Sequence, residues 1–149
     1  MRTIALGLLA VVLVTGVATA QTAGEQARIL RDFDDAVTAY VDGTMQAPKI
    51  FTLPVAMVFR QLIARALAQR DGVAAINGVG AGAHVKAMEP FPSTELHEFP
   101  RVLSDALPPL PDALEYRLIG HDLVVRDKDA DIVVAMMRDA VGPALTVIR

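Results

Sequence analysis

The chain contains no cysteine and only three histidines, and these two shortages limit its chemistry. Without thiols it has no disulfide, no thiolate metal ligand and no cysteine nucleophile. His84, His97 and His121 fall in three different segments, whereas a zinc site usually takes two ligands from one short segment. We therefore expect no metal or other cofactor, and a fold that is stabilised by packing alone.

Serine is almost as scarce. Ser93 and Ser104 are the two serines, both lie in proline-rich sequence, and neither is part of a G-x-S-x-G motif. A serine nucleophile needs a base and an orienting group beside it, and no such set can be assembled. His97 lies between Glu95 and Glu98, which we interpret as loop residues rather than as a glycosidase pair. No catalytic residue is predicted.

The chain also lacks an excess of positive charge. It has 14 basic and 17 acidic side chains and a formal net charge of −3. Nucleic acids are bound by basic faces, and anionic lipids by polybasic segments. The sequence has neither, so we expect no nucleic-acid partner.

The N-terminus has the three parts of an export signal. Arg2 supplies a positive charge, an apolar run follows from Ile4 to Val14, and Ala18-Thr19-Ala20 has the small-x-small form that signal peptidase cleaves. The alternative is an uncleaved anchor, but the apolar stretch is at the lower limit for a span of about 20 residues. We predict a signal peptide at residues 1–20 and Sec export to the periplasm or beyond, with no membrane anchor after cleavage.

Residues 21–149 have the length of a single domain, and two amphipathic helices are predicted in its first half. The first runs from Glu25 to Asp42, with Gly43 as a left-handed C-cap. Its acidic residues, at 32, 34 and 35, are expected on a solvated face rather than in a cation site. The apolar stripe consists of Ile29, Phe33, Val37, Tyr40 and Val41.

The second helix is predicted from Thr52 to Arg70, with Pro54 in its first turn and Gly72 at its end. Apolar residues recur in it at intervals of three and four without a break. They are Val55, Val58, Phe59, Leu62, Ile63, Ala66 and Leu67.

A β-hairpin is predicted between 114 and 127. Apolar and polar residues alternate, and Gly120-His121 suits a type II′ turn, whose first position needs a positive φ. This turn places Tyr116 opposite Val125 and Glu115 opposite Arg126, as an ion pair. One face then carries Leu114, Tyr116, Leu118, Leu123 and Val125.

A third strand is predicted from Ile132 to Met137. A four-residue loop before this strand would turn Ile132, Val134 and Met136 to the core. A three-residue loop would instead turn Val133, Ala135 and Met137 there. The four-residue loop buries more carbon and is preferred. Because every position is apolar, both faces of this strand should be covered. Residues 144–148 are a candidate fourth strand. The predicted class is α+β, with two amphipathic N-terminal helices packed on a three- to four-stranded antiparallel β-meander.

Two segments join the helices to the hairpin. Residues 72–87 are rich in glycine and alanine. Glycine-rich runs also occur in dinucleotide-binding βαβ units, but Pro90 and Pro92 follow too closely for the helix of such a unit. We therefore predict a flexible connector. Residues 89–112 form a proline-rich belt. Pro100 opens one helical turn in it, and 108–111 should be extended and set the angle at which the first strand begins. The alternative is a proline-rich ligand for an aromatic groove.

Asp127, Asp129 and Asp131 are the candidate metal ligands, since their spacing matches the start of an EF-hand loop. The sixth position, however, is Ile132 instead of glycine, and the twelfth is Arg138 instead of glutamate. We interpret the segment as a polar hairpin loop.

Several of these stretches resemble the C-terminal signature of a group of exported bacterial proteins with no assigned activity. The matching residues are Leu107-Pro108-Pro109-Leu110-Pro111, Leu114-Glu115-Tyr116-Arg117, Gly120, Asp122-Leu123-Val124, Asp127 and Ala130, with the helical run 54–63 upstream. Asp131 and Ala135 depart from the pattern, which has Asn and Asp there. The hairpin is also similar to those of small periplasmic proteins tied to nickel and cobalt homeostasis. The resemblance implies an exported protein and no particular activity.

The sequence thus predicts an exported, non-catalytic binding module for an unknown protein or small molecule. The candidate binding residues are Tyr116, Arg117, His121 and Asp122. One alternative is a periplasmic enzyme, metal-dependent or hydrolytic, that uses His97, His121 and the acidic loop. Another is a carrier that holds a small apolar ligand between the helices and the sheet.

Overall fold

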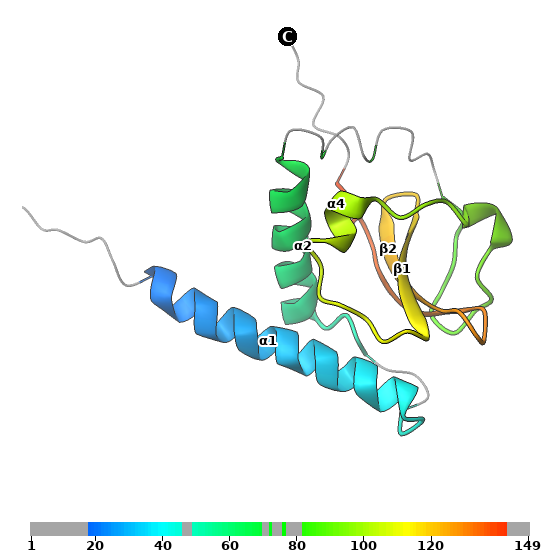
Figure 1. Ribbon diagram of the computed structural model, residues 1–149, viewed down its shortest axis with the longest axis horizontal. Coiled ribbons are helices and arrows are strands. Elements are labelled where there is room, and N and C mark those ends of the chain that lie inside the picture. Colours follow the sequence, from blue (N-terminus) through cyan, green and yellow to red (C-terminus); the bar gives the residue numbers. More distant parts are fainter. Residues whose placement is uncertain (1–17, 46–48, 70–71, 73–75, 77–81, 143–149) are drawn as a thin grey trace, which may run out of the picture.

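The protein has an α+β fold (Figure 1). The computed structural model describes residues 18–45, 49–69, 72, 76 and 82–142. Most of the predicted signal peptide and the candidate fourth strand lie outside these ranges. The elements are α1 (Ala18–Val41), α2 (Leu53–Leu67), the 3₁₀ helix η1 (Ser93–Glu95), α4 (Arg101–Ser104), β1 (Leu114–Ile119), β2 (Asp122–Asp127) and β3 (Ile132–Met137).

Helix α1 buries the face that its sequence pattern predicts. Ile29, Phe33 and Val37 are buried, but Val41, the last residue of the predicted stripe, is 44% exposed. The helix ends at Val41, and Gly43 has the predicted positive φ of 70°. It begins at Ala18 rather than at Glu25, because residues 18–24 contain no proline to stop a helix, although they lack the apolar periodicity from which the start was predicted.

Helix α2 begins after Thr52, with Pro54 in its first turn, and buries most of its predicted stripe. The predicted end is wrong. The helix stops at Leu67, where the N–H of Ala68 donates to the carbonyls of Ala64 and Ala66. Gly72 lies against this end instead of capping it in a left-handed conformation, since a Cβ at 72 would come within 2.4 Å of the Leu67 Cα.

The β1–β2 hairpin has the predicted register. Tyr116 pairs with Val125, Glu115 with Arg126, and Ile119 with Asp122. Gly120 has a φ of 58°, and His121 is not among the positive-φ residues, as a type II′ turn requires. Local turn chemistry and side-chain alternation were therefore enough to fix this part of the sheet.

The predicted facing of β3 is only partly right. The four-residue loop is present, because Asp127 pairs with Ile132. A β-bulge between Val125 and Arg126 then places Val134 as an extra residue in β3, and the side-chain alternation shifts by one. Consequently Met137, and not Met136, joins the core on the helix side, where Val134 and Ala135 are both buried.

Two layers of side chains cover the sheet. On one face, α1 and α2 form the main core, in which the Phe33 and Phe59 rings lie 4.8 Å apart. On the other face Val85 and Phe91 pack against Ile119, Val124 and Val133. Both faces of β3 are therefore covered, as predicted, and the second cover comes from residues 85–91, at the junction of the predicted connector and the proline-rich belt.

Segment 82–91 also makes close backbone contacts with the sheet. Val85 is 6% exposed. A Cβ at Gly82 would lie 2.3 Å from the Gly120 nitrogen, so only glycine fits this approach. Within the described part of the glycine-rich run, the glycine thus serves packing against the hairpin turn. The other residues assigned to a flexible connector lie mostly outside the described ranges.

The belt continues through η1 and the short helix α4, which Pro100 opens as predicted. Leu103 and Leu107 are buried, so this turn anchors the belt to the core before the chain enters β1. Among the described helices, none is both long and apolar enough to cross a membrane.

Candidate functional site

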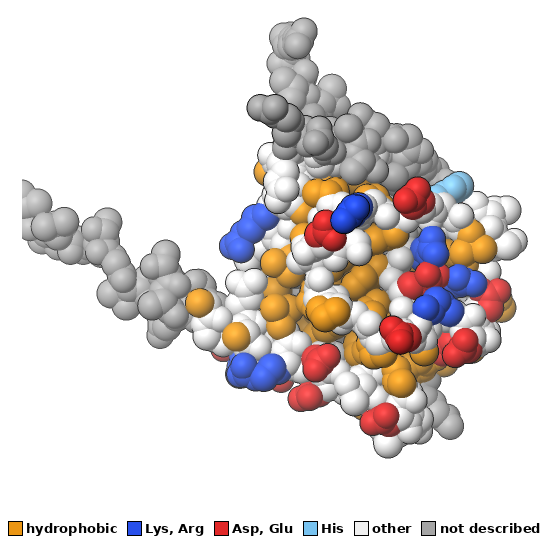
Figure 2. Space-filling model, viewed as in Figure 1, with side chains coloured by type: hydrophobic (Ala, Val, Ile, Leu, Met, Phe, Trp, Pro, Cys, Tyr) orange, Lys and Arg blue, Asp and Glu red, His pale blue; other side chains and the backbone are white. Residues whose placement is uncertain are grey.

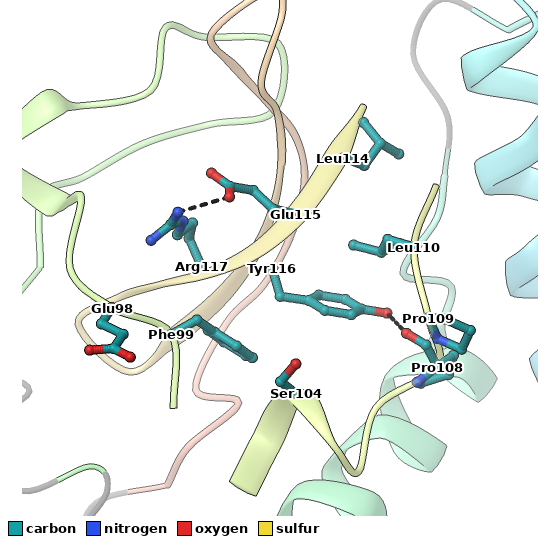
Figure 3. Close-up of a pocket in the computed structure, with 10 residues that line it drawn as sticks. All are labelled: Glu98, Phe99, Ser104, Pro108, Pro109, Leu110, Leu114, Glu115, Tyr116 and Arg117. Carbon is teal, nitrogen blue, oxygen red and sulfur yellow. Dashed lines mark hydrogen bonds and ion pairs between the residues drawn. The ribbon is translucent and has the colours of Figure 1, made fainter. Parts of the chain in front are cut away.

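A hollow of about 370 Å³ lies beside β1. The strand order β1-β2-β3 makes β1 an edge strand, and segments from the proline-rich belt stand opposite it. We call this the edge hollow (Figure 3). Its walls are Leu114, Glu115, Tyr116 and Arg117 of β1, and Glu98, Phe99, Ser104, Pro108, Pro109 and Leu110 of the belt.

The edge hollow follows the open edge of the sheet instead of one of its faces. Successive side chains of a strand point to opposite faces, yet four consecutive β1 residues line this one hollow. Figure 3 shows Tyr116 on one side of the β1 ribbon and Glu115 and Arg117 on the other. A hollow that touches both sets must run along the edge between them.

Its apolar wall is built around Tyr116. The Tyr116 ring stacks on Phe99, with centroids 6.0 Å apart, and its edge-on contact with Phe59 ties it to the main core. The hydroxyl donates to the Pro108 carbonyl at 2.9 Å. Burial raises the pKa of Tyr116, so the hydroxyl stays protonated and holds the proline segment at a fixed distance from the strand. Hydrophobic side chains gather on the surface between α1, α4 and β1, with charged ones around them (Figure 2).

The polar wall is an ion-pair network on the other side of β1. Glu115 accepts from Arg117 at 2.8 Å and from Arg126 at 2.6 Å, and Arg126 also pairs with Asp131 at 2.7 Å. The hydrogen bond from Arg117 lowers the pKa of Glu115, against the opposing effect of burial, and Arg126 lowers it further. The carboxylate is thus ionised, and its two partners are held by charge-assisted bonds.

Arg117 is held in this wall by two hydrogen bonds. One terminal nitrogen donates to the His97 carbonyl at 2.6 Å and the other to Glu115. Its Nε is buried and has no hydrogen-bond partner in the part of the chain that the structure describes. A buried unpaired donor costs roughly 1–3 kcal/mol. The other contacts of the Arg117 side chain must therefore offset this cost and hold the side chain in place.

The four predicted binding residues divide into two pairs. Tyr116 and Arg117 line the edge hollow. His121 and Asp122 lie at the turn end of the hairpin, where the Asp122 carboxylate accepts the Asp139 N–H at 2.8 Å and the His121 carbonyl accepts the Val141 N–H. These two residues therefore fasten the chain after β3 to the turn and do not contribute to the hollow.

Two of the three candidate metal ligands, Asp127 and Asp131, have other partners. Asp127 accepts the N–H groups of Asp129 and Ala130 and the hydroxyl of Tyr40, while Asp131 pairs with Arg126. Burial alone would raise the pKa of Asp127, but these hydrogen bonds outweigh it and lower the pKa. The described residues contain no group of three His, Asp or Glu side chains placed to hold a metal ion. His121 precedes β2 at the opposite end of that strand, whose length from Asp122 to Asp127 is about 17 Å at the usual strand rise.

Sequence reasoning missed the belt side of the edge hollow. Phe99, Pro108 and Leu110 were assigned to a spacer, although they form the wall opposite Tyr116. A signal existed in the sequence, since a stretch with three prolines in four residues, placed directly before an edge strand, makes a rigid wall beside it. The sequence does not show how closely the belt folds back toward β1.

Two other hollows lie near α1. One, of about 490 Å³, runs between α1 and the start of α2, where Leu53 is 73% and Met57 55% exposed. The other, of about 510 Å³, lies between the end of α1 and the acidic loop, and Met45 and Met88 line it.

Comparisons with protein-family models, with curated proteins and with solved structures give no match. The resemblance to an exported bacterial group therefore stays a prediction from the sequence.

Proposed function

We propose that this protein is a small exported binding module and that the edge hollow is its binding site. Export is inferred from the N-terminal signal. The binding site is inferred from one observation: four segments that are separate in sequence converge on a hollow with one apolar and one charged wall. Fixed apolar surface with a few oriented polar groups is what ligand sites have in common.

The wall chemistry favours binding over catalysis. The charges of Glu115 and Arg117 are satisfied within the wall, and the Tyr116 hydroxyl is kept neutral by burial. Ser104 is the hydroxyl that a hydrolase would need as its nucleophile, and no histidine lines the hollow beside it. These groups orient a ligand instead of exchanging protons with it.

A soluble fragment library, screened by amide chemical shifts of the full chain, tests this site. We expect the perturbed amides to cluster at Phe99, Leu110 and 114–117. Phe99→Ala should weaken the best fragment at least roughly tenfold, as expected when about 1.4 kcal/mol of contact is lost. Met57→Ala, an equally apolar truncation in the α1–α2 hollow, serves as the matched control and should leave the affinity unchanged.

The site assignment would be wrong if the shifts clustered at Leu53 and Met57, or if Phe99→Ala bound the fragments as well as the parent chain does. The first result would move binding to the α1–α2 hollow, and the second would remove the Phe99 wall from the site.

Carriage of a small apolar ligand is the second candidate function. It was first considered for the space between the helices and the sheet, but Phe59, Leu123 and Val125 fill that space. The α1–α2 hollow, with its exposed Leu53 and Met57, is the place on the described surface that favours it. Mass spectrometry of an organic extract of the purified protein should then detect a bound lipid, and Met57→Glu should abolish it.

The predicted leader has a direct test. N-terminal sequencing of protein recovered from the periplasm should begin at Gln21, as cleavage after Ala20 requires. A sequence that begins at Met1 would contradict cleavage after Ala20 and favour the uncleaved anchor, and it would leave the binding site untouched. The candidate strand at 144–148 stays part of the proposed architecture.

A further inference from the structure

We infer that the edge hollow takes an extended peptide segment of a partner protein, which pairs with β1 as an added strand. This inference rests on the proposed function and names the class of ligand. It follows from the direction of the β1 backbone groups, from the contrast with β3, and from the chemistry of the two walls.

The backbone groups of Tyr116 and Leu118 point away from the sheet. In a two-residue hairpin the residues that flank the turn, Ile119 and Asp122, form a hydrogen-bonded pair. Bonded and non-bonded pairs alternate along an antiparallel ladder, so Arg117 and Glu115 also bond to β2. Their neighbours Tyr116 and Leu118 direct N–H and C=O outward.

Within the described ranges no other segment makes a backbone hydrogen bond to Tyr116 or Leu118. The edge is closed at its beginning, where the Leu114 N–H donates to Pro111 at 2.9 Å. It is also closed on β3, where both backbone groups of Val133 are bonded to residues 88 and 89. The open part of the β1 edge thus borders the hollow at Tyr116 and continues beyond it to Leu118.

Strand addition explains why one wall of the hollow is apolar and the other is charged. A strand paired with β1 turns alternate side chains to the two faces of the sheet. Those on the Tyr116 side would meet Phe99, Pro108 and Leu110, and those on the Glu115 side would meet charged groups. The fitting segment therefore alternates apolar and polar residues over about four positions, the length from Glu115 to Leu118 at about 3.3 Å per residue.

Backbone pairing of this kind gives affinity through main-chain bonds and specificity through alternate side-chain pockets. The aromatic and proline residues of the belt supply the pockets here. The belt thus receives a peptide and is not itself a proline-rich ligand.

A displayed random linear heptapeptide library, selected against the full chain, tests the inference. We expect the selected peptides to share an apolar-polar alternation. In synthetic copies of the best peptide, N-methylation at the residues that pair with Tyr116 and Leu118 should weaken binding at least tenfold. N-methylation at the residues between them should have little effect, because those amides point away from β1.

A proline in β1 provides the matching test on the protein. Leu118→Pro removes an outward N–H and leaves the β1–β2 ladder intact. Leu118→Ala removes the same side chain and keeps the N–H. We expect the selected peptides to bind the alanine variant and to lose at least tenfold in affinity for the proline variant, with both variants folded by circular dichroism.

The outcomes separate the inference from the proposed function. Peptides that bind at the hollow but tolerate every N-methylation and Leu118→Pro would overturn strand addition and keep the site. Peptides that bind only a chain ending at Gly142 would assign the edge to the chain's own last residues and not to a partner. If no peptide were selected against either chain, strand addition would be overturned, whereas the fragment screen would still decide whether the hollow is a binding site.

Discussion

The two edges of the sheet are treated differently. On the outer side of β3, residues 88–91 follow the strand. Val133 exchanges backbone hydrogen bonds with Met88 and Glu89, and the Phe91 N–H donates to Asp131. On the outer side of β1 the neighbouring belt bonds to the backbone at Leu114 and contacts the next residues through side chains, such as Tyr116 with Pro108 and Arg117 with His97.

An unpaired edge exposes the protein to unwanted strand pairing, and natural proteins usually cover it. In this chain, residues 88–91 bond to the backbone of the first half of β3. The walls beside β1 leave the outward backbone groups of Tyr116 and Leu118 unbonded within the described ranges. This difference is the basis of the proposed strand addition, in which the walls would limit the segments that reach β1.

The largest expected effect is on the covered edge. Phe91 is 4% exposed and lies under the Arg126 guanidinium, which is 5.0 Å from the ring centroid. Phe91→Ala should lower the free energy of unfolding by about 4 kcal/mol, as for other buried phenylalanines, and should speed hydrogen exchange at Val133. Urea unfolding measures the loss. Phe99→Ala, on the open edge, is the matched truncation and should cost less than half as much, because Phe99 is only partly buried. Equal losses would mean that the segments beside the two edges of the sheet are anchored alike.

Proline scanning of β1 should separate its two sets of amides. Arg117→Pro removes a ladder bond and should destabilise the protein by about 3 kcal/mol relative to Arg117→Ala. Leu118→Pro should have nearly the stability of Leu118→Ala, since its N–H faces outward. Thermal unfolding of the four variants checks the alternation. If the two prolines cost the same, the Leu118 amide is bonded and the edge is not open.

The charged wall should give a smaller effect that depends on pH. Glu115 has a pKa below its ordinary value of 4.5 in the folded protein, so its ionised form stabilises the fold. Glu115→Gln should cost about 2 kcal/mol at pH 7, a typical value for hydrogen bonds to a charged group. This stabilisation is present above the unfolded-state pKa and is lost as the pH falls through the lowered folded-state pKa. The difference between parent and variant in urea unfolding should therefore shrink toward zero once the pH is below the folded-state pKa.

For Glu115→Gln, the exposed Glu98→Gln is the control, with an expected change close to zero at every pH. A difference that persists unchanged at low pH would mean that Glu115 acts through packing and not through its charge.

The smallest expected effect is at the acidic loop. The Tyr40 hydroxyl donates to Asp127 at 2.9 Å, and burial together with this carboxylate raises the pKa of Tyr40 to about 12. Tyr40→Phe should cost about 1 kcal/mol in chemical denaturation, the net value of one hydrogen bond. Adding Ca²⁺ should not restore that loss. A metal-dependent recovery of stability in the variant would revive the loop as a cation site.

The parts of this fold that sequence predicts are those set by neighbours in the chain. The hairpin register follows from Gly120-His121 and from alternation, and Gly43 ends α1 through its own backbone freedom. The bulge at Val125 and the second cover at 85–91 depend on contacts between distant residues. No local pattern indicates them.

The same division holds for the edge hollow. Tyr116 and Arg117 were found because they lie on the predicted strand. Phe99 and Pro108 were missed because their place opposite β1 depends on the path of the belt through α4. His121 and Asp122 were candidate binding residues in the predicted turn, but the chain after β3 folds back onto them.

The extra residue in β3 has a consequence for chain length. Since Arg126 pairs with Val133 and Val125 with Ala135, Val134 has no counterpart on β2. A homologue that lacks the residue at position 134 would keep every other pairing between β2 and β3. It would lose only the Val134 side chain from the helix side of the sheet. Gain or loss of a residue in the Gly120-His121 turn would instead shift all the partners of β1. Length variation in this sheet should therefore be tolerated inside its third strand and excluded from its first turn.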